Sequence, residues 1–336
     1  MTTLSRAAVV AGLGAYVPPR VVTNDDLAAF LDTDDEWIRT RTGIAQRHVI
    51  EPGEATSDLA VEAGRRALAS AGTRHADAVV VATSTPDRPC PATAPDVAAR
   101  LGLGHVPAFD VAAVCTGFVY ALATAAGFIA AGTADTVLVI GADTFSTILD
   151  PSDRTTRAVF GDGAGAMLLR AGTQDEQGAL CGLRLGSDGS RSELIEVPGL
   201  GSRTRSTGLP IKEEDTYFTM QGRAVFSEAV QRMSTAVTET AQRIGWSLTD
   251  IDRFVFHQAN SRILAAIAER LEVPAEKLVS NIERVGNTVA ASIPLALADS
   301  LESGGLEPGH RVVLAGFGGG LTWGSVALTW PDTATA

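Results

Sequence analysis

The chain has 336 residues, a formal charge of −12 and 45% hydrophobic residues, enough apolar material for a large core or for two packed halves. Its acidic balance argues against nucleic acid as a partner, because binding to phosphates needs a basic surface. The three cysteines, Cys90, Cys115 and Cys181, are far apart and form no CxxC pair, so the sequence predicts neither a disulfide framework nor a metal site.

Two segments bear on the location of the protein in the cell. Residues 1–6 run directly into a strand-like stretch and lack the regions of a signal peptide, which predicts a cytoplasmic protein. Residues 111–131 contain no charge and are long enough to cross a membrane. However, Cys115, Thr116 and Gly117 divide this segment, and much of it is Ala, Thr and Gly. We therefore expect a buried central helix and no membrane association.

Strand and helix patterns alternate along the whole chain, which is typical of an α/β layered fold. Short apolar runs of β-branched residues predict buried strands, and apolar residues at helical spacing predict helices. The strands are expected at 7–11, 76–82, 135–141, 253–256 and 311–316, and the helices at 58–71, 223–244 and 261–271.

These patterns contain an internal repeat. The strand pair at 77–81 and 135–139 recurs at 252–256 and 310–314, with the same shift of 175 positions for both strands. A common offset for two separate elements favours a duplicated fold. We therefore predict two halves, residues 1–172 and 173–336, whose loops meet on one face and build a shared site.

Cys115 is the first candidate for chemistry, because it stands where a strand pattern changes into a helix pattern. At a helix N-terminus the dipole favours the thiolate, and free amide N–H groups point toward an oxyanion formed beside the sulfur. This arrangement suits a nucleophile that carries an acyl group. The structural alternative is that an unpaired cysteine in an apolar run only fills the core.

Three further features are expected on the same face. His257 ends a buried strand, Asn287 lies in a Gly-Asn-Thr turn, and glycines 316 and 318–320 follow the last predicted strand. Each feature has a structural alternative. His257 could be a structural histidine whose hydrogen bonds are made within the protein, Asn287 could be a turn residue, and the glycines could form only a flexible turn. Together they offer an imidazole, a neutral amide and backbone donors. Such groups suit attack on a thioester and stabilisation of an enolate, which a carboxylate at position 287 would repel.

The chain resembles β-ketoacyl-acyl carrier protein synthase III, a condensing enzyme of the thiolase-like superfamily. Matching stretches cover nearly the whole chain in the family's order: 35–44, the segment around Cys115, 160–166, 257–260, 286–288 and 316–325. The resemblance implies an α/β thiolase-like fold with duplicated αβαβα layered halves. The first half would carry the nucleophilic cysteine, and the second the histidine and asparagine.

The resemblance also implies a reaction. Cys115 takes an acyl group from coenzyme A, and His257 with Asn287 supports decarboxylation of malonyl-acyl carrier protein. The carbanion attacks the acyl-cysteine and gives β-ketoacyl-acyl carrier protein, in fatty acid or polyketide-type chain initiation. The N–H groups of Cys115 and Gly319 form the oxyanion hole, and Phe317 supplies an apolar wall beside the malonyl carboxylate. Acyl-CoA is a substrate, and no tightly bound cofactor is implied.

Binding residues follow from the same resemblance. Trp37 and Arg154 match the pair that sandwiches adenine, and Arg41 and Thr42 match positions near the nucleotide phosphates and pantetheine. Arg262 matches a basic position for carrier-protein docking, although Ser227 stands where some relatives carry Lys. The family is homodimeric, and Cys90 lies on a loop that reaches the partner's acyl pocket. The pantetheine channel would be lined by Met220, Gly222, Phe226 and Asn260.

Three alternatives remain at this stage. The first is an acyltransferase of the same superfamily that moves the acyl group from Cys115 to a hydroxyl or amine in specialised metabolism, with His257 as the base. The second is a cysteine hydrolase, whose Cys-His-Asn order matches but whose local motif is absent. The third is a noncatalytic homologue that only binds carrier protein.

Overall fold

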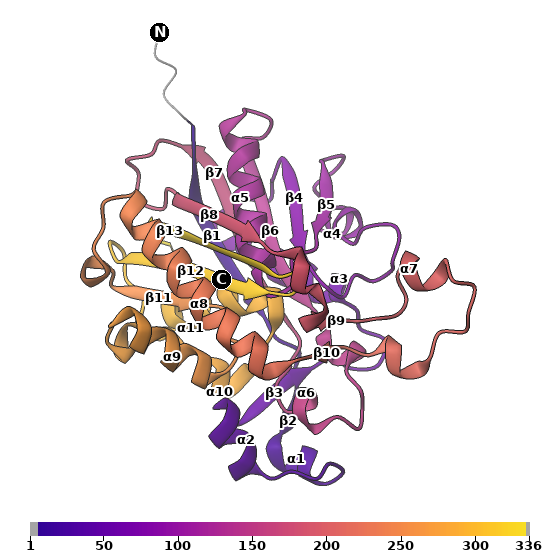
Figure 1. Cartoon of the computed structure of the whole chain (residues 1–336). Coiled ribbons are helices and arrows are strands. Elements are labelled where there is room, and N and C mark those ends of the chain that lie inside the picture. The colour runs from indigo at the N-terminus through magenta and orange to yellow at the C-terminus, as the bar shows by residue number, and fades with distance from the viewer. Residues whose placement is uncertain (1–5, 334–336) are drawn as a thin grey trace.

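Two β-sheets organise the chain, whose computed structural model describes residues 6–333 (Figure 1). The first sheet has the order β1-β7-β6-β4-β5, and the second β11-β12-β13-β8. Strands of the first sheet are β1 (Ala7–Tyr16), β4 (Ala78–Ala82), β5 (Ala108–Val111), β6 (Thr136–Asp143) and β7 (Gly163–Gly172). Strands of the second are β8 (Cys181–Ser187), β11 (Arg253–Phe256), β12 (Arg311–Gly318) and β13 (Thr322–Thr329).

Helices form three layers around these sheets. Helices α5 (Gly117–Ala130) and α11 (Ser292–Glu302) share one buried core with the facing sides of both sheets. Helices α3 (Thr56–Ser70) and α4 (Ala94–Arg100) cover the outer face of the first sheet. Helices α8 (Gly222–Arg243) and α9 (Ser261–Leu271) cover the outer face of the second. The result is the αβαβα order expected from the sequence.

Alternation along the strands explains why each sheet has helices on both faces. In β4, Ala78, Val80 and Ala82 face the central helices, whereas Val79 and Val81 face α3 and α4. All five side chains are buried, because a parallel strand covered on both sides is apolar throughout. This is the physical reason that these strands were recognisable as continuous apolar runs.

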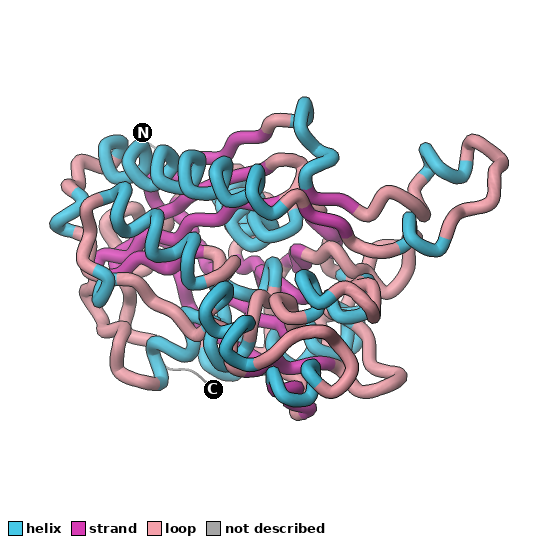
Figure 2. Tube along the Cα trace, turned by 60° about the horizontal axis from the view of Figure 1, so that its bottom comes forward, coloured by secondary structure: helices cyan, strands magenta, loops and turns pink. Residues whose placement is uncertain are grey.

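Smaller elements lie at the edge of the layers, at the bottom and on the right of Figure 1. Between β9 and β10 the chain leaves the body as an arm, residues 198–217, which both Figure 1 and Figure 2 show projecting to one side. The elements are β2 (Arg20–Thr23), α1 (Asn24–Ala28), α2 (Asp35–Thr42), β3 (Gln46–Val49), α6 (Arg154–Arg157), β9 (Ile195–Glu196), α7 (Ser202–Arg205), β10 (Thr219–Met220) and α10 (Ile282–Val285).

The predicted strands and helices are all present, with one correction. Strand β1 does not end before Gly12 but continues to Tyr16. Gly12 and Gly14 lie directly against α3, where a Cβ on Gly12 would come within 2.4 Å of the Ala67 carbonyl oxygen. The glycines therefore allow close packing of strand on helix and do not end the strand.

The uncharged segment forms the predicted buried helix, α5, between the two sheets. None of the helices in residues 6–333 combines the length and hydropathy that a membrane crossing requires. Most of the N-terminal segment without a signal-peptide pattern, residues 1–5, lies outside the described residues.

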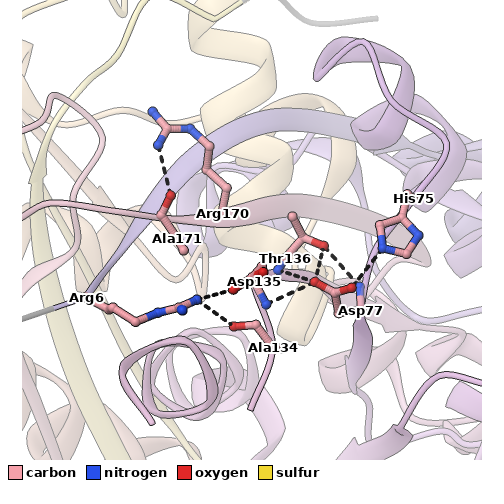
Figure 3. A network of polar contacts seen from close by, with 8 residues as sticks. All are labelled: Arg6, His75, Asp77, Ala134, Asp135, Thr136, Arg170 and Ala171. Carbon is pink, nitrogen blue, oxygen red and sulfur yellow. Dashed lines mark hydrogen bonds and ion pairs between the residues drawn. The ribbon is translucent and has the colours of Figure 1, made fainter. Parts of the chain in front are cut away.

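The internal repeat appears in the register of the sheets. Ala78 pairs with Val137 in the first sheet, and Arg253 pairs with Val312 in the second, at the same offset of 175 positions. Figure 3 shows that Asp77 accepts hydrogen bonds from the backbone N–H groups of residues 135 and 136, at 3.0 and 2.7 Å. Asp252 accepts the corresponding bond from Arg311 N–H at 2.8 Å. The two halves therefore repeat the same strand pair, while the boundary at residue 172 stays a prediction.

The repeat also includes two strained turns. Val114 and Val289, again 175 positions apart, have φ angles of +46° and +51°, which β-branched residues rarely adopt. Each begins a 3-10 turn, Val114–Thr116 and Val289–Ala291, that leads into a central helix. Cys115 in the first half thus corresponds to Ala290 in the second.

The contact of β1 with α3 leads to a stability prediction. Gly12→Ala is expected to destabilise the protein by about 1–3 kcal/mol, because its methyl group would overlap backbone that cannot move aside. Gly127→Ala is the matched control, because Gly127 is exposed on α5 with no atom within 4 Å of a new Cβ. It should stabilise the protein by up to about 1 kcal/mol. Urea unfolding measures both, and equal free energies for the two variants would contradict the close contact.

Candidate active site

One cavity of about 110 Å³ contains the three polar groups expected from the sequence. Cys115, His257 and Asn287 all line it, so the structure brings together a thiol from the first half and an imidazole and a carboxamide from the second. The other lining residues are Val114, Phe145, Val159, Phe160, Ile195, Phe218, Met220, Gly222, Val225, Phe226, Ala229, Met233, Ala259, Asn260, Ile263 and Phe317.

Cys115 lies in the 3-10 turn just before α5, close to the predicted helix N-terminus. Its protonation differs from the sequence-based expectation. Burial, and secondarily the charge of Asp143, raise the pKa of the Cys115 thiol far above its usual range, and its own backbone N–H only partly opposes this. The resting residue is therefore a neutral thiol, because desolvation outweighs the helix dipole.

Glycines bring the backbone of β12 against Cys115. A Cβ on Gly318 would lie 2.7 Å from Cys115 N, and one on Gly316 would lie 3.2 Å from the Cys115 carbonyl oxygen. In the described part of the chain, the N–H groups of Cys115 and Gly319 donate no hydrogen bond to another residue. The Cys115 amide thus remains free beside its own sulfur, and the free Gly319 amide follows directly after Gly318, whose backbone lies against Cys115 N.

His257 follows β11 and is only 2% exposed. Its N–H donates to the Ala315 carbonyl at 2.8 Å, which fixes the residue to β12. Burial lowers the pKa of His257 to about 3, so the imidazole is neutral near pH 7. Ring nitrogen Nδ1 lies 2.7 Å from Ser292 Oγ, which itself donates to the Val289 carbonyl at 2.9 Å.

Ser292 has no role in the sequence-based site and was missed. Because the Ser292 hydroxyl donates its proton to the Val289 carbonyl, its oxygen accepts from Nδ1–H of His257 and favours the tautomer with the proton on Nδ1. The available signal was weak: a serine five positions after Asn287 that begins a helix and is followed by six apolar residues.

The backbone of Asn287 forms hydrogen bonds between the second half of the chain and the first. Its N–H donates to the Val159 carbonyl at 2.9 Å, and its carbonyl accepts from Gly161 N–H at 3.0 Å. The side-chain Oδ1 accepts from Val289 N–H at 3.0 Å, which fixes the orientation of the carboxamide. Nδ2 makes one long contact of 3.5 Å with the Ala259 carbonyl and keeps a second proton for a ligand.

The predicted channel residues line the mouth of this cavity. Met220 and Phe226 are 36% and 37% exposed, which is unusual for large apolar side chains in this protein. Asn260 caps α9 by accepting from Ile263 N–H at 2.9 Å. At the closed end, Phe145, Phe160 and Phe218 pack with ring centroids 4.6 to 5.2 Å apart. The cavity is therefore a narrow apolar passage with polar groups at Cys115.

The predicted nucleotide-binding residues lie outside the cavity lining. Trp37 is on α2, whose first turn is capped by Asp34. The guanidinium carbons of Arg41 and Arg154 lie 4.5 and 5.1 Å from the centre of the Trp37 ring, so stacking partners are already assembled there. Arg154 also bonds the backbone and carboxylate of Asp32.

Two other expectations have different outcomes. Thr42 is buried, and its hydroxyl donates to the Ile38 carbonyl at 2.7 Å and accepts from Ile44 N–H at 3.0 Å. The hydroxyl is thus used at the end of α2, and the expected position of Thr42 near coenzyme A stays a prediction. Arg262 is exposed in the first turn of α9, where a docking protein has access to it.

No group of three or more His, Cys, Asp or Glu side chains is placed to hold a metal ion within residues 6–333. Cys90 is exposed, and Cys181 donates to the Ala327 carbonyl instead of facing the cavity.

Comparison with known proteins agrees with this geometry. Residues 109–189 match the family model of 3-oxoacyl-[acyl-carrier-protein] synthase III, and residues 241–330 match the model of its C-terminal part. β-Ketoacyl-[acyl-carrier-protein] synthase III 5 of Streptomyces coelicolor is 58% identical over 329 residues, which cover 98% of this chain and 99% of the relative. The synthase III of Pseudomonas aeruginosa is 56% identical over 329 residues, with 98% of each chain covered.

Solved structures show the same fold. The crystal structure of 3-oxoacyl-(acyl carrier protein) synthase III from Pseudomonas aeruginosa matches with a TM-score of 0.92 and 55% identity, over 98% of this chain and 99% of that one. The priming β-ketosynthase of the R1128 polyketide pathway matches with a TM-score of 0.89 and 34% identity, over 99% and 98%. The predicted thiolase-like α/β fold is confirmed.

Fold and site together define an acyl-transferring condensing enzyme of the thiolase-like kind. The chain belongs to the β-ketoacyl-[acyl-carrier-protein] synthase III family of fatty acid biosynthesis.

The raised thiol pKa leads to a prediction about reactivity. Alkylation of Cys115 by iodoacetamide should still accelerate between about pH 8 and about pH 9, because the thiolate fraction keeps rising above the ordinary cysteine pKa. Peptide mass spectrometry measures the rate, with the exposed Cys90 as an internal reference for the reagent. A rate that levels off below about pH 7 would mean that the helix dipole outweighs burial after all.

Proposed function

We propose that Cys115 accepts an acyl group from acyl-CoA and that His257 and Asn287 promote decarboxylation of malonyl-acyl carrier protein. Condensation then gives β-ketoacyl-acyl carrier protein, in fatty acid or polyketide-type chain initiation. The observation that carries this proposal is the single apolar cavity lined by the thiol, the imidazole and the carboxamide. The similarity to a β-ketoacyl-[acyl-carrier-protein] synthase III and to the priming β-ketosynthase of a polyketide pathway supports the same reaction.

Acylation begins with removal of the thiol proton. The neutral imidazole of His257 takes it on Nε2 while Nδ1 keeps its proton against Ser292, so no free thiolate has to exist beforehand. The sulfur attacks the acyl-CoA carbonyl, whose oxygen becomes negative and accepts from the N–H groups of Cys115 and Gly319. Collapse expels the coenzyme A thiolate, which recovers the proton from the imidazolium.

Decarboxylation then uses the second half of the molecule. The bond between the malonyl carboxylate and its methylene carbon breaks, carbon dioxide leaves, and the electron pair moves to the thioester oxygen as an enolate. Asn287 Nδ2 donates to that oxygen. His257 also donates, from Nε2, once its ring proton has exchanged through water from Nδ1 to Nε2 and the Ser292 hydroxyl has turned from the Val289 carbonyl to Nδ1. The buried Phe317 disfavours the carboxylate and favours neutral carbon dioxide.

Condensation completes the cycle. The enolate carbon attacks the acyl-cysteine carbonyl, and the same two amides stabilise the tetrahedral oxyanion. The carbon–sulfur bond breaks, the β-ketoacyl-acyl carrier protein leaves, and the Cys115 thiolate takes up one proton from solvent water. In this proposal residues 1–172 supply the nucleophile and residues 173–336 supply the decarboxylation groups.

Substrate binding is proposed at the surface beside the mouth. Trp37 stacks the adenine with Arg154, and Arg41 contacts the nucleotide phosphates. Pantetheine passes the mouth residues described above to reach Cys115. Arg262 provides a basic contact for the acidic carrier protein. Family resemblance supports a cytoplasmic homodimer, in which Cys90 approaches the partner's acyl pocket, and no tightly bound cofactor.

The central test separates the two half-reactions. Wild-type protein incubated with acyl-CoA should gain the mass of one acyl group, and Cys115→Ala should gain none. Added malonyl-acyl carrier protein should then release carbon dioxide, and Asn287→Asp should slow that release by at least about 100-fold, because a carboxylate repels the enolate. Intact-mass and carbon dioxide measurements read these steps. Transfer of the acyl group to a hydroxyl or amine without carbon dioxide release would instead support the acyltransferase alternative.

The free amide beside the sulfur gives a second prediction. Gly318→Ala should slow acylation of Cys115 by about 10- to 100-fold, because the new methyl group would overlap Cys115 N and displace an oxyanion donor. Gly189→Ala is the control, since no atom lies within 4 Å of its new Cβ. Rapid-quench intact mass gives both rates, and an unchanged rate in Gly318→Ala would exclude this amide from the oxyanion hole.

A further inference from the structure

Asp143 is a fully buried carboxyl group that the mechanism above does not use. It ends β6, it is 0% exposed, and no basic side chain pairs with it among the described residues. Its oxygens accept from Ser84 N–H at 2.7 Å and Ala290 N–H at 3.0 Å. They also accept from the hydroxyl groups of Thr85 and Thr83, at 3.2 and 3.3 Å. Burying a carboxyl group this completely is costly, so a strong local reason for its presence is expected.

The internal repeat indicates that reason. Asp143 and Gly318 end equivalent strands 175 positions apart, and the same shift relates Cys115 to Ala290. In the second half, Gly318 has no side chain and leaves Cys115 N–H free for a substrate oxyanion. In the first half, the Asp143 carboxyl group occupies the corresponding place and accepts from Ala290 N–H. A permanent acceptor thus stands where a second active centre would bind its oxyanion.

The bond to Ala290 holds the turn on which Asn287 depends. Ala290 is the middle residue of the 3-10 turn Val289–Ala291, and Val289 has a positive φ that needs support from its surroundings. Val289 N–H in turn donates to Asn287 Oδ1 and so orients the carboxamide. The backbone of His257 is held separately, because its N–H is bonded to Ala315 in the neighbouring strand. Its ring contacts the turn only through Ser292 Oγ, which donates to the Val289 carbonyl.

We infer that Asp143 is a positioning residue for decarboxylation: it fixes the turn at Ala290 and thereby aims the Asn287 carboxamide at the enolate oxygen. This inference rests on the proposed function and adds a residue that acts on only one of its two half-reactions. Acylation should depend much less on Asp143 than decarboxylation does, because the Cys115 turn and the backbone of His257 are held by other contacts. Loss of a negative charge there also does not disfavour the Cys115 thiolate.

Asp143→Asn tests this with little change of shape. In Asn the NH2 group replaces one of the two carboxyl oxygens. It then faces either Ser84 N–H or Ala290 N–H, and that N–H group loses its hydrogen-bond acceptor. Asp77→Asn is the matched control: Asp77 also accepts from two backbone N–H groups and a threonine hydroxyl, but at the opposite end of the same strand pair (Figure 3). Should Asp143→Asn fail to fold, Asp143→Ser replaces it, because serine forces no donor against another donor.

Three quantities are measured for each variant: the rate of acyl-cysteine formation, the rate of carbon dioxide release from malonyl-acyl carrier protein on acylated enzyme, and the urea midpoint. Asp143→Asn should lower carbon dioxide release at least about 10-fold and leave acylation within about 3-fold of wild type. Asp77→Asn should leave the ratio of the two rates unchanged, because its three bonds from residues 135 and 136 go to one oxygen, which the amide oxygen of Asn can replace. Gly318→Ala should show the opposite split, with acylation most affected.

The inference is overturned if Asp143→Asn slows both half-reactions equally, or slows neither while remaining folded. A purely structural role would shift the urea midpoint and leave the ratio of rates at the wild-type value. Failure of the proposed function is a separate result, because wild-type protein itself would then form no acyl-cysteine or release no carbon dioxide.

Discussion

The site depends on a close backbone approach between two strand ends and the starts of two central helices. A Cβ on Gly141 would lie 2.3 Å from the Ala290 carbonyl oxygen, and one on Gly318 would lie 2.7 Å from Cys115 N. Only glycine permits both contacts. These close backbone contacts set the positions of Cys115 and Asn287 in the shared cavity. A small shift of the backbone there would change the distances between the reacting atoms, on which the reaction rate depends.

Burial at this junction determines the charge state of the resting site. It raises the pKa of the Cys115 thiol and lowers that of His257 to about 3, so both groups are neutral at physiological pH. It also raises the pKa of Asp143 to about 7, although four hydrogen bonds oppose this shift. In the proposed reaction the negative charge therefore forms on the substrate oxygens, where backbone amides and the Asn287 carboxamide can donate hydrogen bonds to it.

Duplication has produced two similar frameworks with different tasks. Both halves have the same strand pair, the same register and a strained valine before a central helix. They differ at the decisive positions: Cys115 opposes a glycine in one half, and Ala290 opposes Asp143 in the other. In the first case the Cys115 N–H stays free for a substrate oxygen, and in the second the Ala290 N–H is already bonded to the Asp143 carboxyl group. Such asymmetry explains how a symmetric fold builds a single active site.

The sequence by itself determined the layered α/β class, the repeat of 175 positions and the three polar groups, because burial periodicity and motif chemistry are local properties. It did not determine the thiol pKa, because local dipole reasoning cannot supply the desolvation that packing of both halves imposes. The roles of Ser292 and Asp143 were decided only by tertiary structure, because their partners lie 35 and 147 positions away and meet them only when the sheets pack around the central helices.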